Sequence, residues 1–94
     1  MEKVEIEVYS QASNLAVVQM PGRKVPGIVI QGDSLNILYG LAISIVNRAK
    51  MIGDTELLDE ANELADLLVV HLKHYESVLQ KHGIALPYNP SKLE

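Results

Sequence analysis

PGRKVPGIVIQGDSL, residues 21–35, separates two kinds of sequence pattern and so decides the fold. Before it, Val4, Ile6 and Val8 alternate with charged and polar residues. That period of two is typical of a β-strand with one buried face. After it, apolar residues recur at the spacing of an α-helix. The sequence therefore predicts an α+β fold in which this stretch joins a sheet to helices.

The composition of the chain indicates one small globular domain, residues 1–94. Its 94 residues are 48% hydrophobic, yet they include no Phe, no Trp and only four Tyr, so the core must be aliphatic. This hydrophobic content argues against intrinsic disorder. The final pair, Leu93-Glu94, is not used to predict the fold, since it could derive from cloning.

The net charge of −4 argues against nucleic acid as a partner, because a nucleic-acid surface requires a basic patch. The absence of cysteine excludes a disulfide framework. In the first residues, charged side chains alternate with apolar ones, which does not resemble a signal peptide. No segment reads as membrane-spanning, and we expect no membrane partner and a cytoplasmic protein.

The region of about residues 3–31 predicts a three-stranded antiparallel sheet, because its connections are too short for parallel crossovers. The apolar run 15–20 is expected to be the central strand, and residues 28–30 the third. Both Pro21-Gly22 and Pro26-Gly27 suit type II turns, since proline fixes φ at one turn position and glycine accepts a positive φ at the next.

The rest of the chain predicts a two-helix hairpin, with helices over about 33–52 and 54–82. Asp33 or Ser34 is a candidate cap for the first helix, and Gly53 and Gly83 are signals that end the two helices. The tail after Gly83 is expected to pack back onto the body through its apolar residues.

The first helix is apolar around most of its circumference, more than a small sheet and one helix can cover. Its narrow polar stripe contains Gly40, Ser44 and Asn47, and Gly40 and Ser44 would let another helix approach closely. We therefore expect a homodimer or higher homo-oligomer with these three residues as interface candidates. The alternative is a monomer whose tail covers the surplus.

The loop between the two Pro-Gly pairs is the best candidate for ligand binding. Arg23 and Lys24, with Gln31 and Asp33, could surround a small anion. The alternative is an ordinary hairpin loop with solvated charges. For Asp33 we favour a helix-capping role, because its own carboxylate already supplies the negative charge at that position.

No catalytic, metal or cofactor site is expected. His71, His74 and His82 could share a helical face, but no further ligand has suitable spacing. They fit as solvated side chains or as partners of the helix dipole. No nucleophile–base pair can be assembled, so we expect a protein that is not an enzyme.

Three short motifs in the central stretch, P-G-R, P-G and Q-G-D at residues 21–23, 26–27 and 31–33, give it the pattern P-G-R-x-x-P-G-x-x-x-Q-G-D. With H-G-I at 82–84 and L-P-Y at 86–88, this pattern resembles a family of short bacterial proteins of unknown function, about the length of this chain. The resemblance implies an intact protein and brings no activity, cofactor or catalytic residue.

These patterns predict a small non-enzymatic oligomeric protein that acts through protein–protein contacts. One specific form is an immunity or antitoxin-like partner, since a small acidic chain suits a basic toxin. The alternative is a sensory module that binds a small anion at the Arg23-Lys24 loop.

Overall fold

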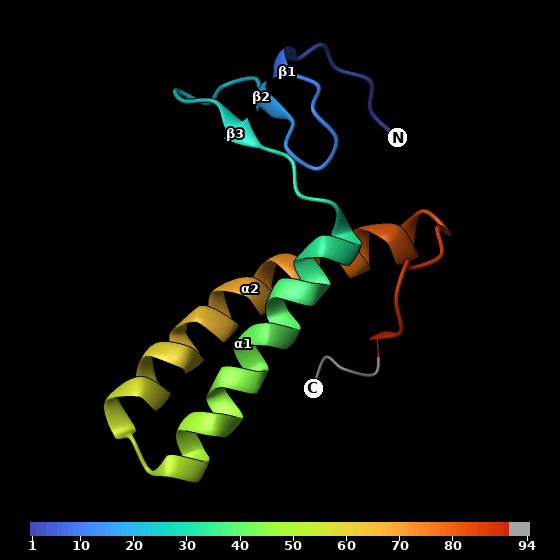
Figure 1. Cartoon of the computed structure of the whole chain (residues 1–94). Helices are drawn as coiled ribbons and strands as arrows, with labels where there is room; N and C mark the ends of the chain where they lie inside the picture. The colour runs from blue at the N-terminus through green and yellow to red at the C-terminus, as the bar shows by residue number, and fades with distance from the viewer. Residues whose placement is uncertain (91–94) are drawn as a thin grey trace. The chain divides into compact units, whose positions relative to one another are not determined.

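The computed structural model describes residues 1–90; residues 91–94, among them Leu93 and Glu94, lie outside this range. The described chain has the predicted α+β arrangement, a three-stranded antiparallel sheet followed by two helices (Figure 1). It divides into two compact units, residues 1–31 and the part that begins at Gly32. The organisation of the chain as one domain stays a prediction.

The sheet has the order β1-β2-β3, with β1 at Glu7–Ser10, β2 at Val17–Gln19 and β3 at Gly27–Ile28 (Figure 1). Both neighbouring pairs are antiparallel, and Val18 of the central strand lies opposite Val8 and Gly27. The prediction that the second strand is central is confirmed. All three strands are shorter than the sequence pattern predicted, and β1 contains a register shift between Val8 and Ser10.

The two Pro-Gly pairs have different conformations. In the first, the Arg23 N–H donates to the Met20 carbonyl at 3.2 Å and Gly22 has φ of 79°, as a type II turn requires. The prediction of a second such turn is wrong. Gly27 instead belongs to β3, where pairing with β2 holds the backbone extended. Pro26 then precedes an edge strand, where its missing N–H costs no ladder hydrogen bond.

The sheet lacks the buried face that the alternating pattern predicted. Val4, Ile6 and Val8 are all exposed, and within residues 1–31 Val18 alone is a buried hydrophobic residue. The prediction was wrong because alternation shows which side chains share a face, whereas burial requires a second layer over that face. Residues 1–31 contain no helix or second sheet to form that layer.

The helical unit is a hairpin of α1, Gly32–Ile52, and α2, Thr55–Lys81. Gly53, with φ of 70°, ends α1, and Asp54 caps α2 by accepting a hydrogen bond at 3.0 Å from the Leu57 N–H. A two-residue connection of this kind requires antiparallel neighbours. At the far end Gly83, with φ of 68°, ends α2, and the Ile84 N–H donates to the Leu79 carbonyl at 2.9 Å. Both predicted helix-ending glycines are confirmed.

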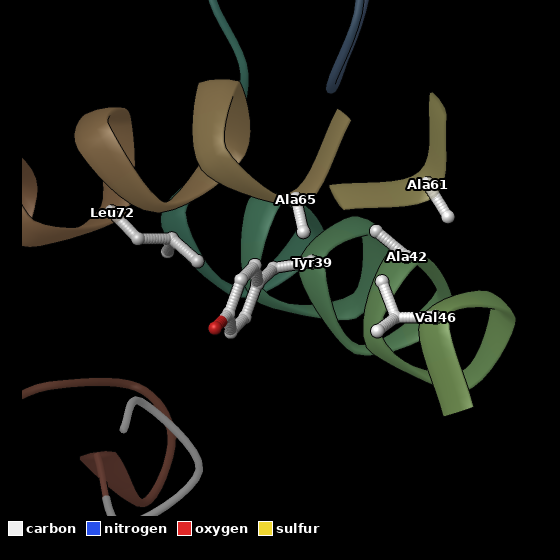
Figure 2. Close-up of a cluster of buried hydrophobic side chains, with 6 residues drawn as sticks. All are labelled: Tyr39, Ala42, Val46, Ala61, Ala65 and Leu72. Carbon is white, nitrogen blue, oxygen red and sulfur yellow. The ribbon is translucent and has the colours of Figure 1, made fainter. Parts of the chain in front are cut away.

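Alanines make up half of the buried cluster between the helices (Figure 2). Ala42 and Ala49 of α1 are at most 1% exposed, and Ala61 and Ala65 of α2 are each 5% exposed. Alanine lets two helix backbones approach closely, because it adds only a methyl group to the interface. The larger members of the buried cluster are Tyr39, Val46 and Leu72.

Gly32, the first residue of α1, is required by a close contact. It is buried, and a Cβ atom added there would collide with the ring of Tyr75 from α2. The glycine of the Q-G-D motif therefore has a packing role, in which the start of α1 lies against the second half of α2.

We predict that Leu72→Ala lowers the free energy of unfolding by about 3 kcal/mol, because Leu72 is fully buried and its truncation leaves a cavity. Met51→Ala is the matched control; Met51 is 85% exposed, and about 0.5 kcal/mol or less should be lost. Urea denaturation at one fixed protein concentration measures both. Equal losses in the two variants would contradict this packing.

Gly32→Ala and Gly40→Ala should have opposite effects on the free energy of unfolding. The first forces Tyr75 to move and should destabilise by about 1–3 kcal/mol. The second places a methyl group in open space on the same helix and should stabilise by up to about 1 kcal/mol. Thermal and urea denaturation monitored by circular dichroism test this contrast, and destabilisation by Gly40→Ala would show that the Gly40 position is covered.

Candidate functional site

The loop between β2 and β3 presents the first group of candidate residues. Its backbone is held by the type II turn and by the Gln19 side-chain amide, which donates to the Arg23 carbonyl. The Arg23 and Lys24 side chains are exposed. The loop is thus fixed through its backbone, while its two cationic groups face solvent.

Arg23 lines two shallow depressions in the sheet unit. The larger, of about 400 Å³, is also lined by the carboxylate residues Glu5 and Glu7. The smaller, of about 290 Å³, is formed by residues 22–25 and includes Lys24. An anion in the larger depression would meet two negative charges beside one positive charge, which weakens the electrostatic case for an anion site there.

The other two anion-site candidates have different surroundings. Gln31 is exposed and lines neither depression. Asp33 lies in the first turn of α1, one residue inside the helix, where its carboxylate accepts a hydrogen bond at 2.8 Å from the Ser34 N–H. This bond satisfies one of the backbone donors that a helix start leaves free. Asp33 therefore accepts a hydrogen bond from a backbone N–H at the start of α1. It does so from inside the first turn and not from the capping position before the helix.

The interface candidates Gly40, Ser44 and Asn47 are exposed on α1 and take no part in its contact with α2. A Cβ atom added to Gly40 would have no atom within 4 Å. Asn36, in the same polar stripe, has a buried Oδ1 atom without a hydrogen-bond partner in the described chain. Whether this stripe contacts another molecule stays a prediction.

A second surface, which the sequence reasoning did not single out, consists of large aliphatic residues on both helices. We call it the apolar hairpin face. Its members are between 36% and 69% exposed. They are Ile37, Leu38, Leu41, Ile45 and Ile52 of α1 with Leu57, Leu64, Leu67 and Val78 of α2.

The two halves of this face lie on the same side of the hairpin. On a helical wheel of about 100° per residue, the exposed apolar stripe and the buried stripe of each helix are roughly a quarter turn apart. In both helices the exposed stripe comes first in the direction of rotation in which residue number increases. Antiparallel helices wind in opposite senses when viewed from one end, so equal offsets bring both stripes to one side. The sequence alone does not locate this face, because it does not show which stripe of each helix contacts the other.

The C-terminal tail packs elsewhere on the hairpin, as the sequence predicted. Tyr88 packs against the buried cluster, and its hydroxyl donates to the Glu76 carboxylate at 2.8 Å. Burial, with the adjacent Glu76 carboxylate, holds the pKa of the Tyr88 hydroxyl well above its ordinary value. Ile84, by contrast, is 55% exposed, so the prediction that it packs back is wrong. On the helical wheel Glu76 falls on the opposite flank from the apolar hairpin face, so this contact leaves that face open.

The histidines are exposed on α2 or just after it, and His71 Nδ1 lies 2.8 Å from the Leu67 carbonyl one turn earlier. Among residues 1–90, no group of three or more His, Cys, Asp or Glu side chains could hold a metal ion. Neither helix in this range is long and apolar enough to cross a membrane.

Comparison with known proteins finds a family whose function is unknown. Residues 1–88 match a family of unknown function (DUF6959). No curated protein and no solved structure matches the chain. The surfaces described above are therefore the basis on which a function can be inferred.

We predict that Tyr88→Phe destabilises the protein by about 1 kcal/mol at neutral pH, because Glu76 loses a hydrogen bond. The wild type should lose stability above about pH 10 more steeply than the variant, since the unfolded chain ionises Tyr88 there while the folded chain keeps it protonated. Urea denaturation across this range tests both points. Parallel pH profiles would contradict the Tyr88–Glu76 contact.

Proposed function

Since the chain belongs to this family of unknown function, we propose its role from its surfaces: a small, non-enzymatic protein that forms a homodimer through the apolar hairpin face. The proposal rests on one observation. Nine large aliphatic side chains of the helical unit, those of the apolar hairpin face, remain substantially exposed.

The size of this face supports a dimer interface. Complete burial of its exposed parts would remove several hundred Å² of apolar surface from water, and a standard interface buries about 800 Å² per partner. Monomers seldom leave a contiguous apolar patch of this size uncovered. A second copy of the chain is the simplest occupant, because closed two-fold dimers are the commonest soluble oligomers.

A basic partner protein, as in an immunity or antitoxin-like role, is the alternative occupant. The net charge of −4 would favour encounter with such a partner. The Arg23-Lys24 loop supports small-anion sensing less well, because Glu5 and Glu7 line the same depression as Arg23. Bacterial origin, the motif as a family signature and a cytoplasmic location stay predictions from the sequence.

We predict that Leu41→Glu weakens dimerisation by roughly tenfold or more, because the dimer would have to bury an unpaired carboxylate. Leu41, 58% exposed, lies within the apolar hairpin face and outside the helix–helix core, so the monomer should stay folded by circular dichroism. Analytical ultracentrifugation measures the dissociation constant.

Asn47→Glu is the matched control for Leu41→Glu, since it adds the same charge on the polar stripe of the same helix. It should leave the dimer intact. Loss of the dimer in Asn47→Glu with retention in Leu41→Glu would instead place the interface on the Gly40–Asn47 stripe. A wild-type monomer would contradict the proposal and favour a different partner.

A further inference from the structure

Two residues of opposite charge interrupt the apolar hairpin face. Arg48 follows Ile45 on α1 by three residues, and Glu60 precedes Leu64 on α2 by four. Residues three or four apart lie on the same side of a helix, so both charged side chains are on the side of the apolar hairpin face. Both are exposed, and neither forms an ion pair within residues 1–90. The chain thus carries one unpaired cation and one unpaired anion on this side.

The two charged residues lie at the same level of the hairpin. The helices run antiparallel and side by side from their connection at residues 53–54, so levels can be counted from there (Figure 1). Arg48 is four residues before the end of α1, and Glu60 is five residues after the start of α2. At about 1.5 Å of rise per residue, their levels differ by only about 1.5 Å.

The apolar members of the face share these levels. On α1 they extend from Ile37 to Ile52, a span that is level with residues 55–70 of α2. All the α2 members except Val78 fall within that range. A contact that sets α1 of one copy against α2 of another therefore matches apolar residues with apolar residues along the whole span.

A two-fold axis can relate two such faces in two ways. In the lengthwise arrangement the axis runs along the helices, so α1 of each copy lies against α2 of the other, and both connections lie at the same end. In the crosswise arrangement the axis runs across the helices, so α1 lies against α1 and α2 against α2. Neighbouring helices are antiparallel in both, so the helix dipoles do not distinguish them. The charges on the face do.

We propose that the homodimer has the lengthwise arrangement, in which Arg48 of each copy pairs with Glu60 of the other. The pairing rests on the proposed function, because it orients that same interface. A lengthwise axis keeps every residue at its own level, so the unlike charges of two copies meet without a shift along the helices. Ion pairs that flank an apolar helix contact set partner choice and orientation in coiled coils.

The crosswise arrangement leaves both charges without partners. Asp33 is the sole carboxylate of α1, and it lies in the first turn, fifteen residues before Arg48. With the axis centred on the apolar span, Arg48 would instead meet Leu41 of the other copy, and Glu60 would lie near the other copy's Leu64. An unpaired charge against an apolar surface loses hydration without compensation, so the lengthwise arrangement is favoured.

Charge reversal followed by mixing tests whether the pair joins two copies. Arg48→Glu and Glu60→Arg should each weaken the homodimer by roughly fivefold or more, because each creates two like-charge contacts per dimer. One variant chain then carries two glutamates at these positions and the other two arginines. A mixture of the two should therefore form a heterodimer with the affinity of the wild-type homodimer. Sedimentation equilibrium of the separate and mixed variants measures these affinities.

Lys50→Glu and Asp59→Arg are the matched controls. They change the net charge of the chain by the same amounts on the same two helices. On the helical wheel, however, Lys50 is about 200° from Arg48 and Asp59 about 100° from Glu60, so both lie off the face. Each should change the affinity by less than about twofold, and mixing them should have no effect. Equal gains on mixing in both pairs would show a general attraction between unlike chains and overturn the pairing.

The double variant Arg48→Glu, Glu60→Arg gives a second readout. It restores an unlike pair at each contact with the two charges exchanged, so it should dimerise with the affinity of the wild type. An affinity as weak as that of the single variants would contradict the pairing. Both positions are exposed, so the variants should stay folded, which circular dichroism checks.

The two proposals fail in different ways. A wild-type chain that sediments as a monomer would overturn both the homodimer and the pairing within it. If the wild-type chain sediments as a dimer, and neither the mixture nor the double variant recovers affinity, the homodimer stands and the lengthwise arrangement is wrong.

Discussion

The close packing of α1 on α2 through small side chains is the contact on which the helical unit depends. Alanines fill much of this contact, so the two backbones can lie near one another. The contact also holds Tyr39, Val46 and Leu72, with partly buried residues packed against them. A further set of large aliphatic residues has no place in this contact. In this hairpin they lie on the outer flank, where they form the apolar hairpin face.

The exposed residues of the apolar hairpin face depart from the usual pattern of a small monomer, in which large apolar side chains fill the core. Tyr39, Val46 and Leu72 follow that pattern and are buried at the contact. The sheet unit shows the same departure, since Val18 is its only buried hydrophobic residue and most of its aliphatic side chains are exposed. The exposed apolar surface in each unit is the physical basis for proposing that the chain works in an assembly.

Much of the fold could be predicted from sequence because the signals were local. Gly53 and Gly83 end their helices, and Pro21-Gly22 turns, since each requires a positive φ that glycine adopts without strain. Gly27 could not be distinguished from Gly22 by its dipeptide, because its conformation is set by pairing with β2. The missing buried face of the sheet likewise depends on what covers it, which alternation in β1 does not encode. For the candidate site, the sequence shows that α1 has more apolar residues than its neighbours can cover. It does not show on which side of the hairpin the exposed ones lie, because that depends on which stripe of α1 contacts α2.

The most direct test of an assembly through the helical hairpin is the mass of the wild-type chain in solution. Sedimentation equilibrium over a range of protein concentrations should give twice the 10.4 kDa mass of one chain, with dissociation on dilution. A mass of one chain throughout the micromolar range, in a sample folded by circular dichroism, would contradict the proposed dimer and leave the apolar hairpin face to a different partner.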